Sequence, residues 1–384
     1  MTTATTAFTP QPAQPSARPL VAPGGGPVAL LRQVGPNWYA TVMGTAIVAN
    51  AGAALPGCPG WLRAACTVVW ALSAALLVAV VAARAGHWAF HGDQARRHLL
   101  DPAVAPFQGC MPMALLAVGA GTLSVGSRVI GERAAVAVDA TLWGLGAATA
   151  LLVAAAVPYL MVVRHRVTPG DASPVWLLPV VAPMVAAATG PALAAHLPAG
   201  ATQAREALLL GCFAMFGMSL LATLMMLPLV WSRLVGGGPL PLALTPALFL
   251  VLGPLGQSTT AVGQIADAAR GTVPAPYTEA LRGFAVLYGV PVMGFALLWL
   301  AVAAAMVVRA ARRGMGFAMT WWAFTFPVGT CVTGAASLAR HTGLHALTWL
   351  AVGLYVLLAV AWATAGARTL HGAVRGGLLA APAR

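Results

Sequence analysis

Long continuous apolar segments make up most of this chain, and they limit its fold more than any other feature of the sequence. Each segment is about 20 residues or longer, the length that a helix needs to cross the hydrocarbon core of a membrane. The segments do not alternate between apolar and polar residues, so they indicate helices rather than the strands of a barrel. Only 8% of the residues are charged, against about 25% in soluble domains. The sequence therefore predicts an all-α integral membrane protein and excludes a soluble globular enzyme.

Charged breaks and breaks rich in Gly and Pro divide the apolar sequence into ten candidate transmembrane helices. They cover residues 38–55, 62–84, 104–126, 134–163, 174–196, 205–231, 241–263, 280–309, 317–339 and 345–370. We expect a disordered cytoplasmic N-terminal tail at 1–34, because this stretch is rich in Pro, Thr, Ala and Gly and lacks the pattern of a signal peptide. The ten-helix transmembrane domain then occupies 35–371, and a short cytoplasmic C-terminal tail occupies 372–384.

All 21 basic residues are arginines, and they are divided unequally between the two sides of the predicted domain. An even number of helices places both termini on one side, which receives 14 arginines, while the opposite side receives seven. Basic loops stay in the cytoplasm, so both termini are predicted to be cytoplasmic, in a bacterial-type inner membrane or a plasma membrane. The net charge of +13 is then explained by the orientation of the protein in the membrane and by attraction of anions. No nucleic-acid partner is expected.

Prolines recur inside alternate predicted helices at nearly constant spacing, which indicates an internal repeat. Pro112, Pro183, Pro254 and Pro327 lie in the third, fifth, seventh and ninth helices, at intervals of 71, 71 and 73 residues. One further step back reaches the first helix near Gly44, so we expect helix kinks at these five positions. The pattern predicts five helical hairpins in quasi-fivefold arrangement, with the odd-numbered helices lining a central pore and the even-numbered helices facing lipid.

The ninth helix carries two phenylalanines, Phe324 and Phe326, which point in roughly opposite directions because they are two residues apart. Phe326 shares a face with the hydroxyls of Thr330 and Thr333, whereas Phe324 shares the opposite, apolar face. Periodicity therefore favours Phe326 as the residue that faces the pore. The alternative, that both phenylalanines are ordinary packing residues, fits the same periodicity.

Hydroxyl side chains are concentrated on the proline-bearing helices, and we predict that several of them line the pore. Each could instead only bond to its own helix backbone, but the concentration on these helices is the useful signal. The seventh helix, for example, carries the run Gln257, Ser258, Thr259 and Thr260, and the third carries Ser124. The predicted pore-lining residues are Thr41, Thr45, Thr122, Thr189, Ser258, Thr330 and Thr333.

The ionisable residues argue against several other functions. Within the predicted helices, carboxylates and arginines occur only near the ends, Asp139 among them, which disfavours a cation channel or an ion-coupled transporter. His87 and His91 are four residues apart, but no third ligand is apparent, so they are interpreted as a solvated helix face and no metal site is predicted. No catalytic motif or cofactor-binding motif occurs, so we predict no catalytic residues and no cofactor.

Four motifs resemble a known family of transporters. They are VGPNWYATVMGTAIVAN (34–50), WLLPVVAPMVAAATG (176–190), VLGPLGQSTTAVG (251–263) and WWAFTFPVGT (321–330). Together they resemble the tellurite-resistance/dicarboxylate transporter (TDT) family, which includes plant slow-type anion channels and fungal malate and sulfite transporters. The resemblance covers residues 32–370, which is nearly all of the membrane region.

The resemblance implies five hairpins around a pore, assembly as a homotrimer, and closure of the pore by a phenylalanine of the ninth helix. Phe326 immediately precedes Pro327 and is the natural match for that phenylalanine, with Phe324 as the fallback. The implied substrate is a small anion such as tellurite, sulfite, a C4-dicarboxylate or an inorganic monovalent anion, which would pass in a channel-like or facilitative way through a membrane of lipid. The alternatives are a proton-linked exporter of sulfite, tellurite or C4-dicarboxylates, and a membrane scaffold or enzyme without transport activity.

Overall fold

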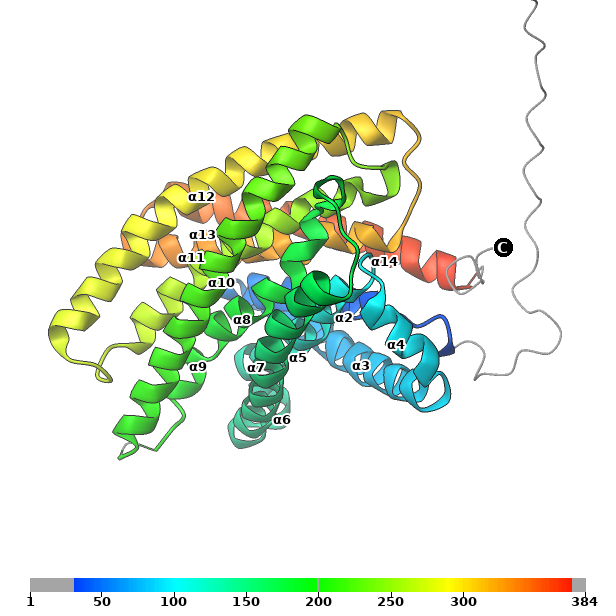
Figure 1. Cartoon of the computed structure of the whole chain (residues 1–384). Coiled ribbons are helices and arrows are strands. Elements are labelled where there is room, and N and C mark those ends of the chain that lie inside the picture. The colour runs from blue at the N-terminus through cyan, green and yellow to red at the C-terminus, as the bar shows by residue number, and fades with distance from the viewer. Residues whose placement is uncertain (1–30, 199, 375–384) are drawn as a thin grey trace, which may run out of the picture.

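Each of the ten predicted membrane segments forms helical elements in the computed structural model, which describes residues 31–198 and 200–374. The described residues contain no strand, so the all-α prediction is confirmed. Figure 1 shows the course of the chain. The helical elements are η1 (Pro36–Trp38), α2 (Tyr39–Ala54), α3 (Gly60–Phe90), α4 (Gly92–Leu100), η2 (Ala105–Gly109), α5 (Cys110–Gly121), η3 (Thr122–Gly126), α6 (Ser127–Ile130), α7 (Glu132–Val163), η4 (Pro169–Asp171), η5 (Pro174–Trp176), α8 (Leu177–Thr189), α9 (Pro191–Ala194), α10 (Thr202–Gly237), η6 (Leu242–Val251), α11 (Leu252–Ala268), α12 (Ala275–Arg312), η7 (Met319–Phe324), α13 (Phe326–Thr342) and α14 (His345–Val374).

Eight helical segments within the described residues are long and apolar enough to cross a membrane, so this is a multi-pass membrane protein. The other two predicted crossings correspond to α2 and α13, which have 16 and 17 residues. A 17-residue α-helix is about 26 Å long, which is shorter than the ~30 Å hydrocarbon core. A total of ten crossings therefore stays a prediction. The predicted tails lie outside the described residues, apart from 31–34 and 372–374.

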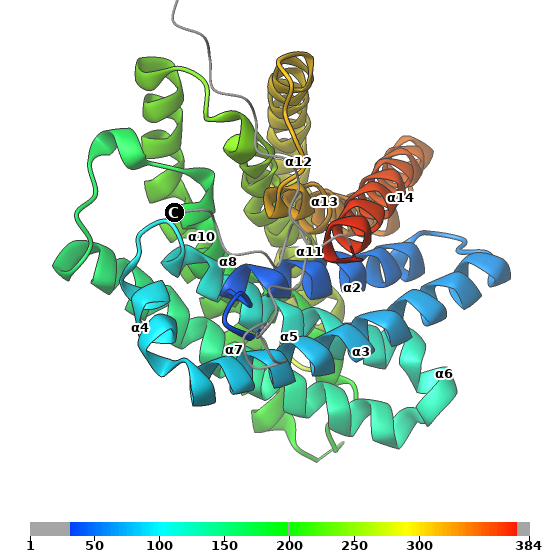
Figure 2. The same cartoon turned by 90° about the vertical axis from the view of Figure 1, so that its right-hand side faces the viewer.

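The helices α2, α5, α8, α11 and α13 contact one another in a closed cycle, in which each contacts the next and α13 contacts α2. Five longer helices surround them: α3, α7, α10, α12 and α14 each pack against the inner helix that precedes them in the chain and against the next inner helix of the cycle, which is α2 in the case of α14. Figure 2 shows α3, α12 and α14 on the outside of α2, α11 and α13. This arrangement is the one that a ring of five hairpins requires, while their rotational equivalence stays a prediction.

Burial separates the inner helices from the outer ones. In the most apolar part of the segments that contain α5, α8 and α11, 56%, 89% and 78% of the residues are buried, against 17% to 33% in the five outer helices. A helix that is apolar all round but largely exposed in the isolated chain presents its outer side to lipid. The outer helices therefore cover the inner ring on its lipid side.

The predicted kink prolines coincide with a change of helix type in three of the inner helices. Pro112, Pro254 and Pro327 lie in the first turn of α5, α11 and α13, directly after a 3₁₀ segment or, for α13, after the break at Thr325. The first turn of an α-helix tolerates proline because its N–H has no helical partner. Pro183 alone lies well inside its α-helix, α8. The sequence predicted kinks in the middle of helices; at these three prolines the structure has instead the start of an α-helical stretch.

Gly44 differs from the prolines, because no change of helix type occurs at this position of α2. A Cβ there would collide with the hydroxyl of Thr325 and with the ring of Trp322. The absence of a side chain therefore lets α2 approach η7 and the start of α13 closely.

Candidate functional site

Three hollows lie one after another between the five inner helices. Their order is seen from the lining residues, which shift along the helices by one or more turns from one hollow to the next. On α2, for example, the lining passes from Ala40 to Met43 and then to Ile47 and Asn50. We call the end of the bundle that carries Val34 and the end of α14 the terminal end, and the opposite end the distal end. The hollow nearest the terminal end is called the terminal hollow, the middle one the central constriction, and the one nearest the distal end the distal vestibule.

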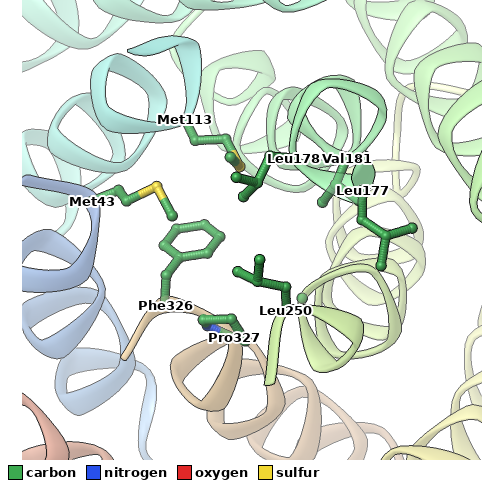
Figure 3. Close-up of a pocket in the computed structure, with 9 residues that line it drawn as sticks. Met43, Met113, Leu177, Leu178, Val181, Leu250, Phe326 and Pro327 are labelled. Atoms are coloured by element: carbon green, nitrogen blue, oxygen red, sulfur yellow. The ribbon is translucent and has the colours of Figure 1, made fainter. Parts of the chain in front are cut away.

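We call the succession of the three hollows the path, and the central constriction is its narrow middle. It has a volume of about 10 Å³, which is at the lower limit for holding one water molecule. All five inner segments contribute apolar side chains to it: Met43, Met113, Leu177, Leu178, Val181, Leu250, Phe326 and Pro327, together with Gly253. Figure 3 shows the ring of Phe326 pointing into the space between Met43, Met113, Leu178 and Leu250. A hydrated ion finds no polar side chain among the lining residues described here.

The two phenylalanines of the ninth segment have separate surroundings. Phe326, the first residue of α13, is 2% exposed and lines the constriction. Phe324 packs edge-on against Phe249, with ring centroids 4.8 Å apart, and also against Trp321. Phe324 lines none of the three hollows, so its surroundings are those of a packing residue.

The terminal hollow is also almost closed, with a volume of about 20 Å³. Trp322 borders it and at the same time borders a lateral apolar groove between α2, α3 and α14. The indole Nε1 of Trp322 donates a hydrogen bond to Thr369 Oγ1 at 2.9 Å, which fixes the ring against α14. The side chain of Trp322 therefore separates the path from the outer surface of the bundle.

The distal vestibule is wide and polar, with a volume of about 650 Å³. Hydroxyl and amide side chains from all five inner segments line it: Asn50, Ser124, Thr189, Gln257, Thr260, Gln264 and Thr333. The hydroxyls of Thr260 and Thr333 lie 2.7 Å apart and join α11 to α13. Asn50 donates to the Ala117 carbonyl at 2.9 Å, which joins α2 to α5. These groups can hydrogen-bond to a hydrated solute without a fixed charge of their own.

Charged groups surround the mouth of this vestibule. Arg63, Arg340 and His196 line it together with one carboxylate, Asp267. Asp267 lies 3.4 Å from Nε2 of His341, and Arg340 donates to the Ala54 carbonyl at 3.2 Å. The two arginines against one carboxylate give the mouth a positive balance, which attracts anions.

Two of the seven hydroxyl residues predicted to line the pore, Thr189 and Thr333, are in the vestibule. Thr41 and Thr45 instead line the lateral groove, where Thr45 accepts a hydrogen bond from Trp362 Nε1 at 3.1 Å. Thr122 accepts one from Trp70 Nε1 at 3.0 Å and faces α3. These three side chains lie on other faces of their helices than the prediction placed them.

The last two predicted hydroxyls, Ser258 and Thr330, are fully buried and line none of the three hollows. Ser258 donates to the Leu255 carbonyl, and Thr330 donates to the Pro327 carbonyl at 2.7 Å. A hydroxyl that bonds to its own helix backbone is compatible with a packed helix interface, so its presence does not reveal the pore face.

The vestibule residues Asn50 and Gln264 were not predicted from the sequence, and Ser124, Gln257 and Thr260 were noted there without being selected. Gln257, Thr260 and Gln264 are three and four residues apart, so one helix face carries all three. This amide-bearing stripe is the signal that could have identified the pore side of α11.

Two ionisable residues are placed differently from the prediction. Asp139 lies two turns inside α7 and is 1% exposed, with its Oδ1 next to Gly119 of α5 and without a hydrogen-bond partner. His87 is fully buried rather than solvated; its Nδ1 lies 2.9 Å from the Leu31 carbonyl, and its ring stacks on His98. Burial in a helix interface explains both differences, because periodicity did not show that these faces are covered.

A closed ring of helices around a path that narrows to an apolar constriction defines this chain as a membrane transport protein. The family profile described as SLAC1, voltage-dependent anion channel, matches residues 33–370. The chain therefore belongs to this family, and the predicted relationship to the tellurite-resistance/dicarboxylate transporters and slow-type anion channels is confirmed. Anion transport is the function that this membership supports.

Curated relatives cover nearly the same region. A sulfite efflux pump of Arthroderma otae is 26% identical over 342 residues, which are 88% of this chain and 90% of the relative. A sulfite efflux pump of Trichophyton rubrum has the same identity and coverage. An uncharacterized transporter of the archaeon Methanocaldococcus jannaschii is 24% identical over 336 residues, which are 87% of this chain and 92% of the relative.

Proposed function

We propose that this protein lets small anions cross the membrane through the path inside the five inner helices, and that Phe326 is its gate. The observation that carries this proposal is the central constriction, where side chains from all five inner segments meet around the Phe326 ring. A ring that occupies the narrowest point of the path can open it by rotation, and an off-rotamer side chain costs only about 0.5–1.5 kcal/mol. Phe324 lines none of the three hollows, which supports Phe326 over Phe324 as the gate.

The charges along the path favour anions over cations. The lining residues of the terminal hollow and of the central constriction include no carboxylate, and the mouth of the distal vestibule carries Arg63 and Arg340. In addition, α13 begins at Phe326, so the positive end of its helix dipole lies at the constriction. Weak sites made of hydroxyls, amides and helix ends allow an anion to pass without being trapped.

Sulfite is the first candidate substrate, because two relatives are sulfite efflux pumps. Tellurite, C4-dicarboxylates and inorganic monovalent anions stay candidates by resemblance to the family. We further propose that the protein lies in a bacterial-type inner membrane or a plasma membrane with its terminal end in the cytoplasm, and that it assembles as a homotrimer. The placement in the membrane rests on the unequal distribution of arginines between the two sides, and the homotrimer rests on family resemblance alone.

A proton-linked exporter is the second candidate function, and one observation favours it. The buried carboxyl of Asp139, whose Oδ1 has no hydrogen-bond partner, is the kind of group that transporters use to carry a proton inside the membrane. Asp139 packs against α5 and does not line the path, so any coupling would act through the packing of α5 and α7.

Flux measurements on the purified protein in liposomes test the proposal. Sulfite, tellurite, malate, nitrate and chloride are offered separately, at zero voltage with an imposed pH gradient and at a fixed voltage without one. Facilitated passage predicts flux that follows the anion gradient and the voltage. Flux that requires the pH gradient supports the proton-linked exporter, and absence of flux for every anion, also in Phe326→Ala, overturns both.

A further inference from the structure

Three arginines from two outer helices converge on one hollow at the terminal end of the bundle. Arg233 comes from the last turns of α10, Arg309 comes from the last turn of α12, and Arg313 directly follows that helix. The hollow has a volume of about 440 Å³ and is completed by residues 239–242, Thr245, Met306 and Ala310. It shares no residue with the three hollows of the path, so it is a separate site.

The positive charge of this hollow is not neutralised within the described part of the chain. None of the three guanidinium groups is within ion-pair distance of a carboxylate there. Asp171 is near Arg233, but it does not line the hollow, and both its hydrogen bonds, at 2.8 Å, come from the backbone N–H and the hydroxyl of Thr168. Arg309 and Arg313 are four residues apart in the sequence and both line the hollow, so their like charges repel.

The arginine of α10 is held in place by the backbone. Arg233 donates from Nε to the Gly170 carbonyl at 2.7 Å and from Nη1 to the Gly238 carbonyl at 2.8 Å. Attraction to a helix C-terminal dipole accounts for arginines at the ends of α10 and α12. It does not account for their meeting at one hollow from two helices, so a binding site for an anion is the better explanation.

We propose that this hollow binds the phosphate group of an anionic membrane lipid such as phosphatidylglycerol. Guanidinium groups bind phosphate through paired, charge-assisted hydrogen bonds. The hollow lies at the ends of α10 and α12, two helices long and apolar enough to cross a membrane. Exposed apolar side chains such as Trp231 and Val308, which are 53% and 50% exposed, precede these ends and offer a surface for acyl chains. A tryptophan near the end of such a helix is typical of the membrane interface.

Native mass spectrometry of the full-length protein with added phosphatidylglycerol or phosphatidylcholine tests this site. Wild type is expected to retain phosphatidylglycerol preferentially. The double variant Arg309→Gln/Arg313→Gln is expected to bind it about tenfold more weakly or worse, because each basic group adds to the attraction of anionic lipid. Arg312→Gln removes a neighbouring charge that does not line the hollow and should leave binding unchanged. Arg309→Lys/Arg313→Lys keeps the charge but loses the paired hydrogen bonds of the guanidinium groups, so it should restore the binding only in part.

A second arm separates a lipid from a soluble phosphate. Inorganic phosphate is added at millimolar concentration to wild type and to the double variant, and thermal unfolding is followed. Stabilisation of wild type alone by inorganic phosphate, without preference for phosphatidylglycerol, would overturn the lipid as the occupant. Equal binding of phosphatidylglycerol by wild type, Arg312→Gln and the double variant, with the double variant still folded and active in anion flux, would overturn the site itself.

Discussion

Phe324 and Phe326 are only two residues apart, yet one packs against Phe249 and the other fills the centre of the bundle. The 3₁₀ segment η7 ends at Phe324 and α13 begins at Phe326, so the chain changes helix type between them. Pro327 favours this change, because it cannot supply a helical N–H and restricts the residue before it. The proline that marks the repeat therefore also places the Phe326 ring.

Replacement of Phe326 by Ala should raise anion flux. Removing the ring opens the constriction, and an increase on the order of tenfold corresponds to a barrier lowered by about 1.4 kcal/mol. Flux of sulfite and chloride into liposomes measures the effect. Phe324→Ala is the matched control and should leave flux near the wild-type value. A rise in Phe324→Ala without one in Phe326→Ala would show that the gate is assigned to the wrong residue.

The sequence was sufficient to predict the inner ring, because prolines and apolar periodicity are local signals of how a helix packs. The distinction between Phe324 and Phe326 was predictable for the same reason. A spacing of two residues predicts different directions around a helix, and the two side chains do have different surroundings, although the chain changes helix type between them.

The pore-lining hydroxyls were harder to predict, because two buried faces of an inner helix look alike in sequence. Thr45 and Thr122 meet tryptophans of outer helices, whereas Thr333 faces the vestibule, and all three are hydroxyls on proline-bearing or glycine-bearing inner helices. Which face meets the hairpin partner depends on packing between segments far apart in the chain. Single-sequence periodicity does not contain that information.

Gly256→Ala should destabilise the protein. A Cβ at this position of α11 would collide with the backbone of α13 at Thr330 and Cys331, where neither atom can move without shifting a helix. Overpacking of this kind costs about 1–3 kcal/mol or more. Thermal unfolding in detergent, followed by loss of monodispersity, measures it. Gly217→Ala, on the outer helix α10, has open space and should be neutral; equal stability of the two variants would contradict the close approach of α11 and α13.

Arg63→Gln should lower anion flux through the vestibule. Arg63 lines the mouth, and loss of its charge reduces the local concentration of anions, so a decrease of a few-fold is expected at low ionic strength. The difference from wild type should vanish near 1 M salt, where the screening length falls to about 3 Å. Arg133→Gln removes an exposed arginine outside the vestibule lining and serves as the control. A decrease that persists at high salt would indicate a structural rather than an electrostatic role.

Asp139→Asn separates the two candidate functions. The carboxyl is buried between α7 and α5 without a partner for Oδ1, and an ionised carboxylate in such a place is costly, so we expect the neutral form to be the one that packs there. Asn has nearly the same shape as the neutral acid. Facilitated passage therefore predicts unchanged flux and a change in unfolding free energy of less than about 1 kcal/mol. Asp139→Arg, which forces a charge against Gly119, should fail to fold and confirms that the site is closed. If Asp139→Asn folds normally but loses flux driven by a pH gradient while keeping flux driven by voltage, the carboxyl carries the proton and the protein is a proton-linked exporter.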